Sequence, residues 1–357
     1  MDAADCGRLV VGGFEGTALP PRMARALQER QRGGVILFGR NVAGGPSEVA
    51  ALLRQIHACS ADTPLVGVDQ EGGRVARMRA PLLVVPPMQT VASWGDPALA
   101  ERIAGAVGAQ LAALGFTIAF APVLDVNTRP DNPIIGDRSF GAHPETCGRF
   151  GVAWIRGLQG SGLLACAKHF PGHGDTTTDS HLELPIVEHP RDRLDRVELS
   201  PFRAAAAAGV AAMMTAHVVF TAIDPALPAT LSRAVCGVLR AQIGFGGMIV
   251  SDDLEMQAIS ARWSIEDAAV LAVAAGCDVL LVCSSEEKQE RAVEAIAREA
   301  ESSTSFRVRC AEAVSRVASA MRGASARPQD DAVIARALDG NEARALSAEM
   351  DRRRWCR

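Results

Sequence analysis

Short apolar runs alternate along this chain with segments that have the periodicity of amphipathic helices. One such helix carries apolar residues at positions 49, 52, 53 and 56, the i, i+3, i+4, i+7 pattern of a single buried face. The apolar runs have the length of buried strands. They cover residues 8–12, 34–38, 65–69, 117–126, 163–170, 211–218, 247–252 and 277–283. Strands and helices that alternate predict a parallel sheet with right-handed crossovers, and eight units predict an α/β fold, a closed (β/α)8 barrel of the TIM type.

A doubly wound open sheet is the alternative to a barrel. It would need a Gly-rich phosphate-binding turn after the first strand, and residues 12–16, Gly-Gly-Phe-Glu-Gly, are only a weak version of one. We therefore assign residues 1–324 to a single catalytic barrel domain. Residues 325–357 are charged and Arg-rich, and we expect them to form a C-terminal tail with one or two surface helices.

The segment 168–185, KHFPGHGDTTTDSHLELP, concentrates residues that can carry chemistry. It follows a buried apolar run and contains three of the seven histidines of the chain. Lys168 comes directly after that run, where a charge without a partner is costly to bury. The alternative is a solvated polar loop, which by itself explains Asp179-Ser180-His181 equally well. The combination of Lys168 and His169 with the loop favours a functional site.

Polar residues also end several other predicted strands. These residues are Asp69, Asp125, Lys168, His169, His217 and Asp252, and Asp252 is followed by Asp253. Barrel enzymes place their active sites at the carboxyl ends of the strands. The pattern therefore predicts one site shared by these side chains.

A carboxylate at a strand end can attack an anomeric carbon and form a covalent glycosyl-enzyme, and Asp252 is the candidate nucleophile. His181 is the candidate acid/base, because an imidazole exchanges protons near neutral pH. Asp179, two residues away, is placed to orient its ring.

The turn after residue 69 offers a candidate clamp for sugar hydroxyls. A carboxylate accepts from hydroxyls and an arginine donates in a fixed fork, so Asp69 with Arg74 and Arg77 suits such a ligand. A capped turn with a salt bridge explains the same residues, and Arg138 has the same ambiguity.

Composition narrows the function classes. A net charge of −4 gives no reason to expect nucleic acid or an anionic membrane as a partner. Nine cysteines without a zinc spacing indicate reduced thiols in a reducing compartment. The N-terminus lacks the pattern of a signal peptide, and no run is long enough to span a bilayer. We expect a cytoplasmic protein.

Several motifs in this order resemble the signature of glycoside hydrolase family 3 β-N-acetylhexosaminidases. They are VDQEGGRV at 68–75, FAPVLDV at 120–126, KHFPGHG at 168–174 followed by DSH at 179–181 and a proline at 185, SDDLEM at 251–256 and AGCD at 275–278. The likeness extends over residues 7–298. It is greatest to the single-domain bacterial branch that cleaves N-acetylglucosamine from peptidoglycan fragments in the cytoplasm.

The resemblance implies a retaining double displacement, with Asp252 as nucleophile and His181 with Asp179 as acid/base. It implies no metal and no organic cofactor. The sugar-binding positions that it implies are Asp69, Arg77, Arg138, Lys168, His169 and His217. The expected substrate is a small sugar, such as N-acetylglucosaminyl-anhydro-N-acetylmuramyl peptides, and the expected state is a monomer without nucleic-acid or membrane partners.

Three other functions remain alternatives. A phosphorylase for N-acetylglucosaminides or glucosides would use the same scaffold, because a neutral histidine avoids the repulsion that a carboxylate imposes on phosphate. A metal-dependent barrel hydrolase usually has a His-x-His on an early strand, which this chain lacks. A non-catalytic sugar-binding barrel would have lost Asp252 or the Asp179/His181 pair.

Overall fold

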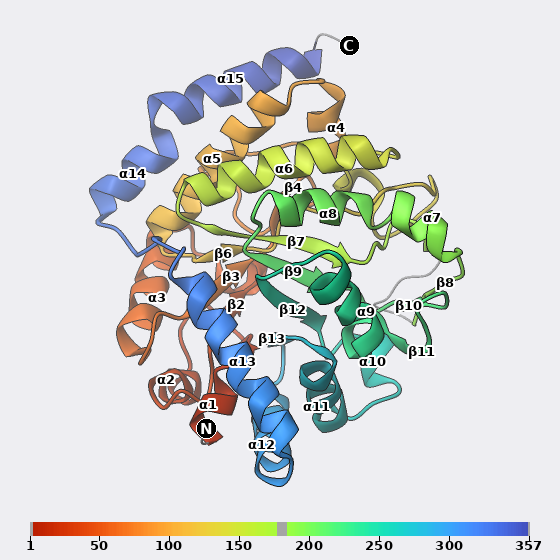
Figure 1. Cartoon of the computed structure of the whole chain (residues 1–357). Helices are drawn as coiled ribbons and strands as arrows, with labels where there is room; N and C mark the ends of the chain where they lie inside the picture. The colour runs from red at the N-terminus through yellow and green to blue at the C-terminus, as the bar shows by residue number, and fades with distance from the viewer. Residues whose placement is uncertain (1–2, 177–183, 356–357) are drawn as a thin grey trace.

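The computed structural model describes residues 3–176 and 184–355. Within them, eight parallel strands close into a barrel in the order β1-β13-β12-β9-β7-β6-β3-β2 (Figure 1). These strands are β1 (Val10–Gly12), β2 (Gly34–Leu37), β3 (Leu65–Val68), β6 (Ile118–Ala119), β7 (Leu164–Phe170), β9 (Ala212–Thr215), β12 (Met248–Asp253) and β13 (Val279–Val282). The predicted (β/α)8 barrel is confirmed.

Helices return the chain between the strands and cover the outside of the barrel (Figure 1). They include α2 (Pro21–Gln28), α3 (Pro46–Cys59), α5 (Pro97–Leu114), α6 (Pro144–Gly160), α8 (Ser200–Ala207), α9 (Arg233–Gly237), α11 (Ile265–Ala275) and α12 (Glu286–Ser302). Asp96 caps α5 by accepting a hydrogen bond from the Leu99 N–H at 3.0 Å. Gly115 ends the helix with a φ of 112°, which favours glycine.

Shorter helices and strands lie in the connections at the two ends of the barrel. They are α1 (Ala3–Gly7), α4 (Met88–Ser93), α7 (Arg191–Arg196), α10 (Gln257–Ser260), the hairpin β4 (Gln70–Gly72) and β5 (Val75–Ala76), and a small sheet of β8 (Ile186–Val187), β10 (Val219–Phe220) and β11 (Asp224–Pro228). The β4–β5 hairpin follows β3 directly and therefore lies at the carboxyl end of the barrel.

The strand predicted over residues 117–126 is much shorter in the structure. Only Ile118–Ala119 form a regular ladder, and Val123 makes an isolated bridge with Lys168. Pro122 has no N–H to donate, and the Leu124 N–H donates to the Lys168 carbonyl at 2.7 Å. The irregular segment therefore stays beside the end of β7 and carries Asp125 to the neighbourhood of Lys168.

Apolar side chains fill the inside of the barrel and the layer between strands and helices. The inner cluster includes Val11, Ile36, Phe120, Met214 and Val250, and it ends against Met321 and Ala324. Met321 is the last residue of α13 (Thr304–Met321), so this helix and the residues after it close the amino-terminal end of the barrel. The opposite, carboxyl end is left for the polar residues.

The C-terminal residues form two helices, α14 (Asp331–Asp339) and α15 (Asn341–Trp355), which lie along α5 (Figure 1). Leu346 and Met350 are buried, and Gln110 of α5 donates to the Ala337 carbonyl at 3.1 Å. A domain boundary after residue 324 stays a prediction. None of the described helices is long and apolar enough to cross a membrane.

Candidate active site

A cavity of about 330 Å³ opens at the carboxyl end of the barrel. Its floor includes apolar residues of the inner cluster, such as Ile36, Phe120 and Met214. Ten polar or charged side chains line it: Asp69, Glu71, Arg74, Arg77, Arg138, Lys168, His169, His173, Asp252 and Asp253. Four of the six residues predicted from the strand ends, Asp69, Lys168, His169 and Asp252, therefore line one cavity.

Five charged side chains form a continuous row of ion pairs in the cavity wall. The Lys168 Nζ lies 2.8 Å from Asp69 Oδ1 and 2.6 Å from Glu71 Oε1. At one end of this row of ion pairs, Arg77 Nη2 lies 3.1 Å from Asp69 Oδ2. At the other, Arg138 Nε and Nη2 donate to the two Glu71 oxygens at 2.8 and 2.9 Å. Three cations and two carboxylates leave one positive charge in excess.

Glu71 and Lys168 keep their charges because each is buried against opposite charge. Burial alone would raise the pKa of Glu71, but the positive charges of Lys168 and Arg138 hold this pKa well below its ordinary value. Burial would lower the pKa of Lys168, and the carboxylates of Asp69 and Glu71 reverse that, so the pKa is raised. The buried lysine therefore presents a permanent ammonium group to the cavity.

Asp125 fixes the position of the two histidines that line the cavity. Its carboxylate is fully buried and accepts from the His169 N–H at 3.1 Å and the His173 N–H at 2.6 Å. The other oxygen lies 2.7 Å from His169 Nδ1. Burial would raise the pKa of Asp125, but the His169 imidazole lowers it below its ordinary value. With Nδ1 held by Asp125, the ring of His169 has Nε2 left for other partners.

Asp252 and Asp253, at the end of β12, have opposite pKa shifts. Burial would raise the pKa of Asp252, but the imidazoles of His217 and His169 and the N–H of Asp253 lower it overall. That N–H donates to Asp252 Oδ1 at 2.8 Å. For Asp253, burial and the nearby carboxylates of Glu255 and Asp252 raise the pKa to about 7. Asp252 is thus the carboxylate that is ionised at neutral pH, as a nucleophile must be.

A model of the N-terminal domain of glycosyl hydrolase family 3 matches residues 14–320. The chain belongs to glycosyl hydrolase family 3. A β-hexosaminidase of Thiobacillus denitrificans is 41% identical over 279 residues, which are 76% of this chain and 77% of that protein. This confirms the resemblance inferred from the motifs, and the chain is a glycoside hydrolase.

Solved structures of family 3 enzymes have the same fold. A β-N-acetylglucosaminidase from Paenibacillus sp. str. FPU-7 is 38% identical, with a TM-score of 0.90 over 98% of this chain and 68% of that chain. NagZ from Neisseria gonorrhoeae, solved in complex with N-trifluoroacetyl-D-glucosamine, is 29% identical, with a TM-score of 0.80. That match covers 97% of each chain.

Most of the sugar-binding residues expected of this family 3 chain lie together in the cavity: Asp69, Arg77, Arg138, Lys168 and His169. His217 is placed differently. His217 is not among the described residues that line the cavity. Its Nε2 donates to the Asp253 carbonyl at 2.9 Å, and its Nδ1 lies 2.8 Å from the Thr230 hydroxyl. It therefore contacts the backbone at the end of β12, close enough to Asp252 to lower the pKa of that carboxyl group.

The predicted acid/base pair cannot be compared with this geometry, because Asp179 and His181 lie outside the described residues. The chain before them is anchored at Asp175, whose carboxylate accepts from the Thr128 hydroxyl at 2.6 Å and lies 3.2 Å from His189 Nε2. This anchor holds residue 175 beside the Asp125 segment, at the carboxyl end of the barrel.

Glu71 and Asp125 are site residues that the sequence analysis did not assign. Asp125 was noticed at a strand end but given no role. For Glu71, the available signal was charge balance within the expected sugar-binding positions, where the cations Arg77, Arg138 and Lys168 shared one carboxylate, Asp69. Buried charges need partners, so a second carboxylate was required nearby, and Glu71 is two residues from Asp69.

One group of described residues has the geometry of a metal site. Ligand atoms of Asp175, His189 and Glu198 lie within 4.8 Å of one another. Arg193, however, lies 3.5 Å from Asp175 and 3.1 Å from Glu198, so a guanidinium already supplies positive charge between the two carboxylates. The group is also outside the cavity lining, and we assign it a structural role.

Proposed function

We propose that this chain is a retaining exo-β-N-acetylglucosaminidase that removes terminal N-acetylglucosamine from peptidoglycan-derived muropeptides. The observation that carries the proposal is the ionised carboxylate of Asp252 beside a wall of sugar-binding charges centred on Lys168. A carboxylate in this place can attack an anomeric carbon, and polar side chains around it can hold the hydroxyl groups of one sugar.

In the first step, Asp252 forms a bond to the anomeric carbon while the bond to the leaving oxygen breaks, and His181 gives its proton to that oxygen. In the second step, His181 takes a proton from water, and the water oxygen displaces Asp252. Asp179 orients the imidazole and stabilises its protonated form. The first step needs Asp252 charged and unprotonated, which its lowered pKa provides, and in the second step the same low pKa makes the released carboxylate a good leaving group.

The sugar is held by groups that do not change their charge during the reaction. The carboxylate of Asp69 accepts from hydroxyls, and Arg77, Lys168 and Arg138 donate. His169 contributes Nε2, because Asp125 holds its Nδ1. His217 acts as a positioning residue through the Asp253 carbonyl.

Exo-cleavage and the N-acetyl preference have separate support. A volume of about 330 Å³ is near the lower end of small-molecule sites, roughly 300–1,000 Å³, and suits a single terminal sugar. Two structural relatives are a β-N-acetylglucosaminidase and a protein in complex with N-trifluoroacetyl-D-glucosamine. The muropeptide aglycone rests on the likeness to the bacterial peptidoglycan-fragment branch.

The decisive experiment measures release of p-nitrophenol from its β-N-acetylglucosaminide and, as a substrate control, from its β-glucoside. Asp252→Asn should lower kcat by about a thousandfold or more, the scale for loss of a covalent nucleophile. Asp253→Asn is the matched control, with the same change one residue away, and should keep most of the activity. A fully active Asp252→Asn variant would refute the nucleophile assignment.

Two additions separate the alternatives. His181→Ala should lower kcat about 10²- to 10⁴-fold, the usual range for a general acid/base. Phosphate in the assay distinguishes transfer to water from transfer to phosphate: a phosphorylase would release sugar 1-phosphate at a rate that rises with phosphate concentration. With a muropeptide mixture, mass spectrometry should show loss of one terminal N-acetylglucosamine per molecule and no internal cleavage.

A further inference from the structure

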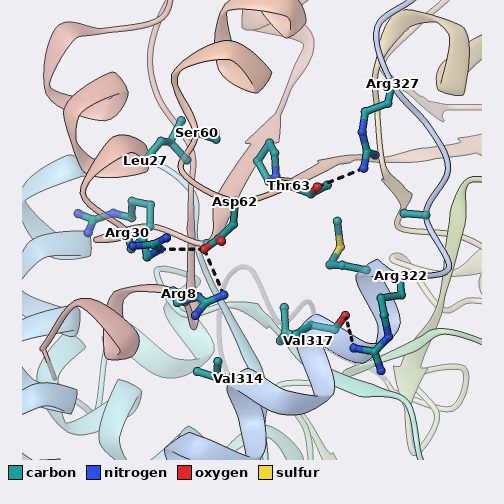
Figure 2. A pocket seen from close by; sticks show the side chains of 16 residues that line it. Arg8, Leu27, Arg30, Ser60, Asp62, Thr63, Val314, Val317, Arg322 and Arg327 are labelled. Atoms are coloured by element: carbon teal, nitrogen blue, oxygen red, sulfur yellow. Dashed lines mark hydrogen bonds and ion pairs between the residues drawn. The ribbon is translucent and has the colours of Figure 1, made fainter. Parts of the chain in front are cut away.

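Figure 2 shows a second cavity, also of about 330 Å³. It lies at the opposite end of the barrel from the candidate active site. Gly33 and Pro64 in its wall come directly before β2 and β3, so it belongs to the amino-terminal end of the strands. Val314 and Val317 of α13 form its apolar side. Nothing in the proposed hydrolase mechanism uses this place.

The cavity concentrates positive charge in a chain whose net charge is −4. Five arginines and one aspartate line it: Arg8, Arg30, Arg32, Arg322, Arg327 and Asp62. Asp62 is shared, because Arg8 and Arg30 each lie 3.1 Å from its carboxylate, and Arg8 also lies 3.6 Å from Asp5 outside the lining. Within the part of the chain that the structure describes, none of the other three arginines forms an ion pair with a carboxylate. The cavity therefore has a large local excess of positive charge.

Arg32 is the most unusual of these groups because it is only 5% exposed. Its Nε donates to Gln289 Oε1 at 3.0 Å and its Nη1 to the Gln31 carbonyl at 2.5 Å, so its hydrogen-bond partners are neutral, and the carboxylates of Glu290 and Glu286 act on it only without a hydrogen bond. Burial lowers the pKa of this guanidinium to about 10. An anion in the cavity would relieve the cost of burying this charge.

Arg322 and Arg327 lie across the cavity from Arg8 and Arg30 (Figure 2). They too have neutral partners. Arg327 Nη2 donates to the Thr63 hydroxyl at 3.1 Å, and Arg322 Nη2 donates to the Ser319 hydroxyl at 2.9 Å. Each guanidinium has five N–H donors in a planar fork, and such forks suit the oxygens of a phosphate group.

We propose that this cavity is a binding site for a small organic phosphate, with the phosphate among the arginine side chains and an apolar body against α13. The arginines supply charge-assisted hydrogen bonds, which are stronger than neutral ones. Leu27, Val314, Val317 and Met321 supply an apolar surface that inorganic phosphate alone would leave uncovered. Both features together select a phosphate ester over a simple anion.

The test is isothermal titration calorimetry of the full chain with phenyl phosphate and adenosine 5′-monophosphate as probes. Inorganic phosphate and adenosine are the partial ligands, and N-acetylglucosamine is present throughout to occupy the active site. At least one ester should bind more tightly than either partial ligand, and its affinity should fall as salt is raised. No binding of either ester, or equally tight binding of adenosine, would overturn the proposal.

The variant R322Q/R327Q removes two exposed guanidinium groups and should weaken the ester that binds by about tenfold or more. The control R344Q/R352Q makes the same charge change at two exposed positions on α15 and should leave the affinity unchanged. Both variants should cleave the chromogenic substrate at the wild-type rate, which shows that they are folded. Equal weakening in both variants would mean a general charge effect and would refute a specific site.

Discussion

Replacement of Glu71 by glutamine isolates the role of the buried row of ion pairs. Glutamine keeps the shape of the side chain, removes its charge and replaces one acceptor oxygen with an NH2 donor. Glu71 is 1% exposed, and it is the shared partner of Lys168 and Arg138. After the change Lys168 still has Asp69 at 2.8 Å. Arg138 keeps the Ile134 carbonyl at 3.1 Å and at most one amide oxygen of the glutamine as acceptors, and it no longer pairs with a carboxylate in this row of ion pairs.

The size of the effect follows from what is left unpaired. Breaking a buried ion pair costs roughly 3–5 kcal/mol, because an uncompensated charge stays in a place of low dielectric. Since Lys168 keeps one carboxylate, we expect a loss near the lower end, about 3 kcal/mol in the free energy of unfolding. The excess charge of the cavity wall rises by one unit, so the sugar-binding groups shift and KM rises.

Denaturant unfolding of the wild type and Glu71→Gln measures this loss, and the pH dependence identifies its source. The folded-state pKa of Glu71 is below its ordinary value, so its stabilisation is complete above the unfolded pKa of about 4.3 and is lost as pH falls toward the folded pKa. The difference between the two proteins should be full at pH 7 and smaller at pH 3.

A matched control is Glu266→Gln. Glu266 accepts from Arg291 in the same two-bond geometry, at 2.8 and 3.0 Å, but the pair is exposed to solvent. Exposed ion pairs contribute little, so this variant should unfold almost like the wild type. Equal losses in the two variants, or a difference that does not change with pH for Glu71→Gln, would refute the argument from burial.

Three further predictions concern other buried carboxyl groups. The pKa of Asp253 is raised to about 7, so the stability that it contributes is full below pH 4 and lost as pH rises through 7; Asp253→Asn should remove this slope from the unfolding free energy. Asp125→Asn should raise KM and lower kcat in the chromogenic assay while circular dichroism stays native, because His169 loses its orienting charge. Asp278→Asn should cost about 3 kcal/mol in denaturant unfolding, since buried Asp278 pairs with Arg240 and Arg309, but should leave kcat of the folded enzyme unchanged.

The barrel could be predicted because its signal is repeated eight times and does not depend on any one strand boundary. The segment 117–126 shows the limit of this approach. Its apolar composition is that of a buried strand, yet only Ile118–Ala119 join the ladder. Burial can be inferred from the apolar composition of the segment. Hydrogen-bond pairing depends on Pro122, which has no N–H, and also on the neighbouring strand, whose position the pattern of one segment does not contain.

The residues of the candidate site could be predicted only from the rule that the carboxyl ends of parallel strands meet at the same end of a barrel. That rule brought Asp69, Lys168 and Asp252 together in the cavity lining, whereas His217, which it also proposed, donates to the Asp253 carbonyl, and its role in binding sugar stays a prediction. Position along the chain predicts which end of the barrel a residue occupies. The direction of a side chain after the last residue of a strand depends on the local backbone, which the sequence pattern does not specify.

Asp252 and Asp253 show why the chemistry of this site needed the structure. The two residues are identical and adjacent, and both line the cavity, so a position at the end of a strand does not by itself separate their chemistry. Their side chains meet different surroundings because successive residues of a strand point in different directions. Asp252 interacts with the imidazoles of His217 and His169, which lower its pKa, whereas Asp253 is buried near the carboxylate of Glu255, and its pKa is raised.

The environment thus gives one aspartate the charge that a nucleophile needs and keeps its neighbour partly protonated at neutral pH. Exchange of their roles would require moving the histidines, so the assignment of Asp252 depends on β7 and β9 as much as on β12 itself.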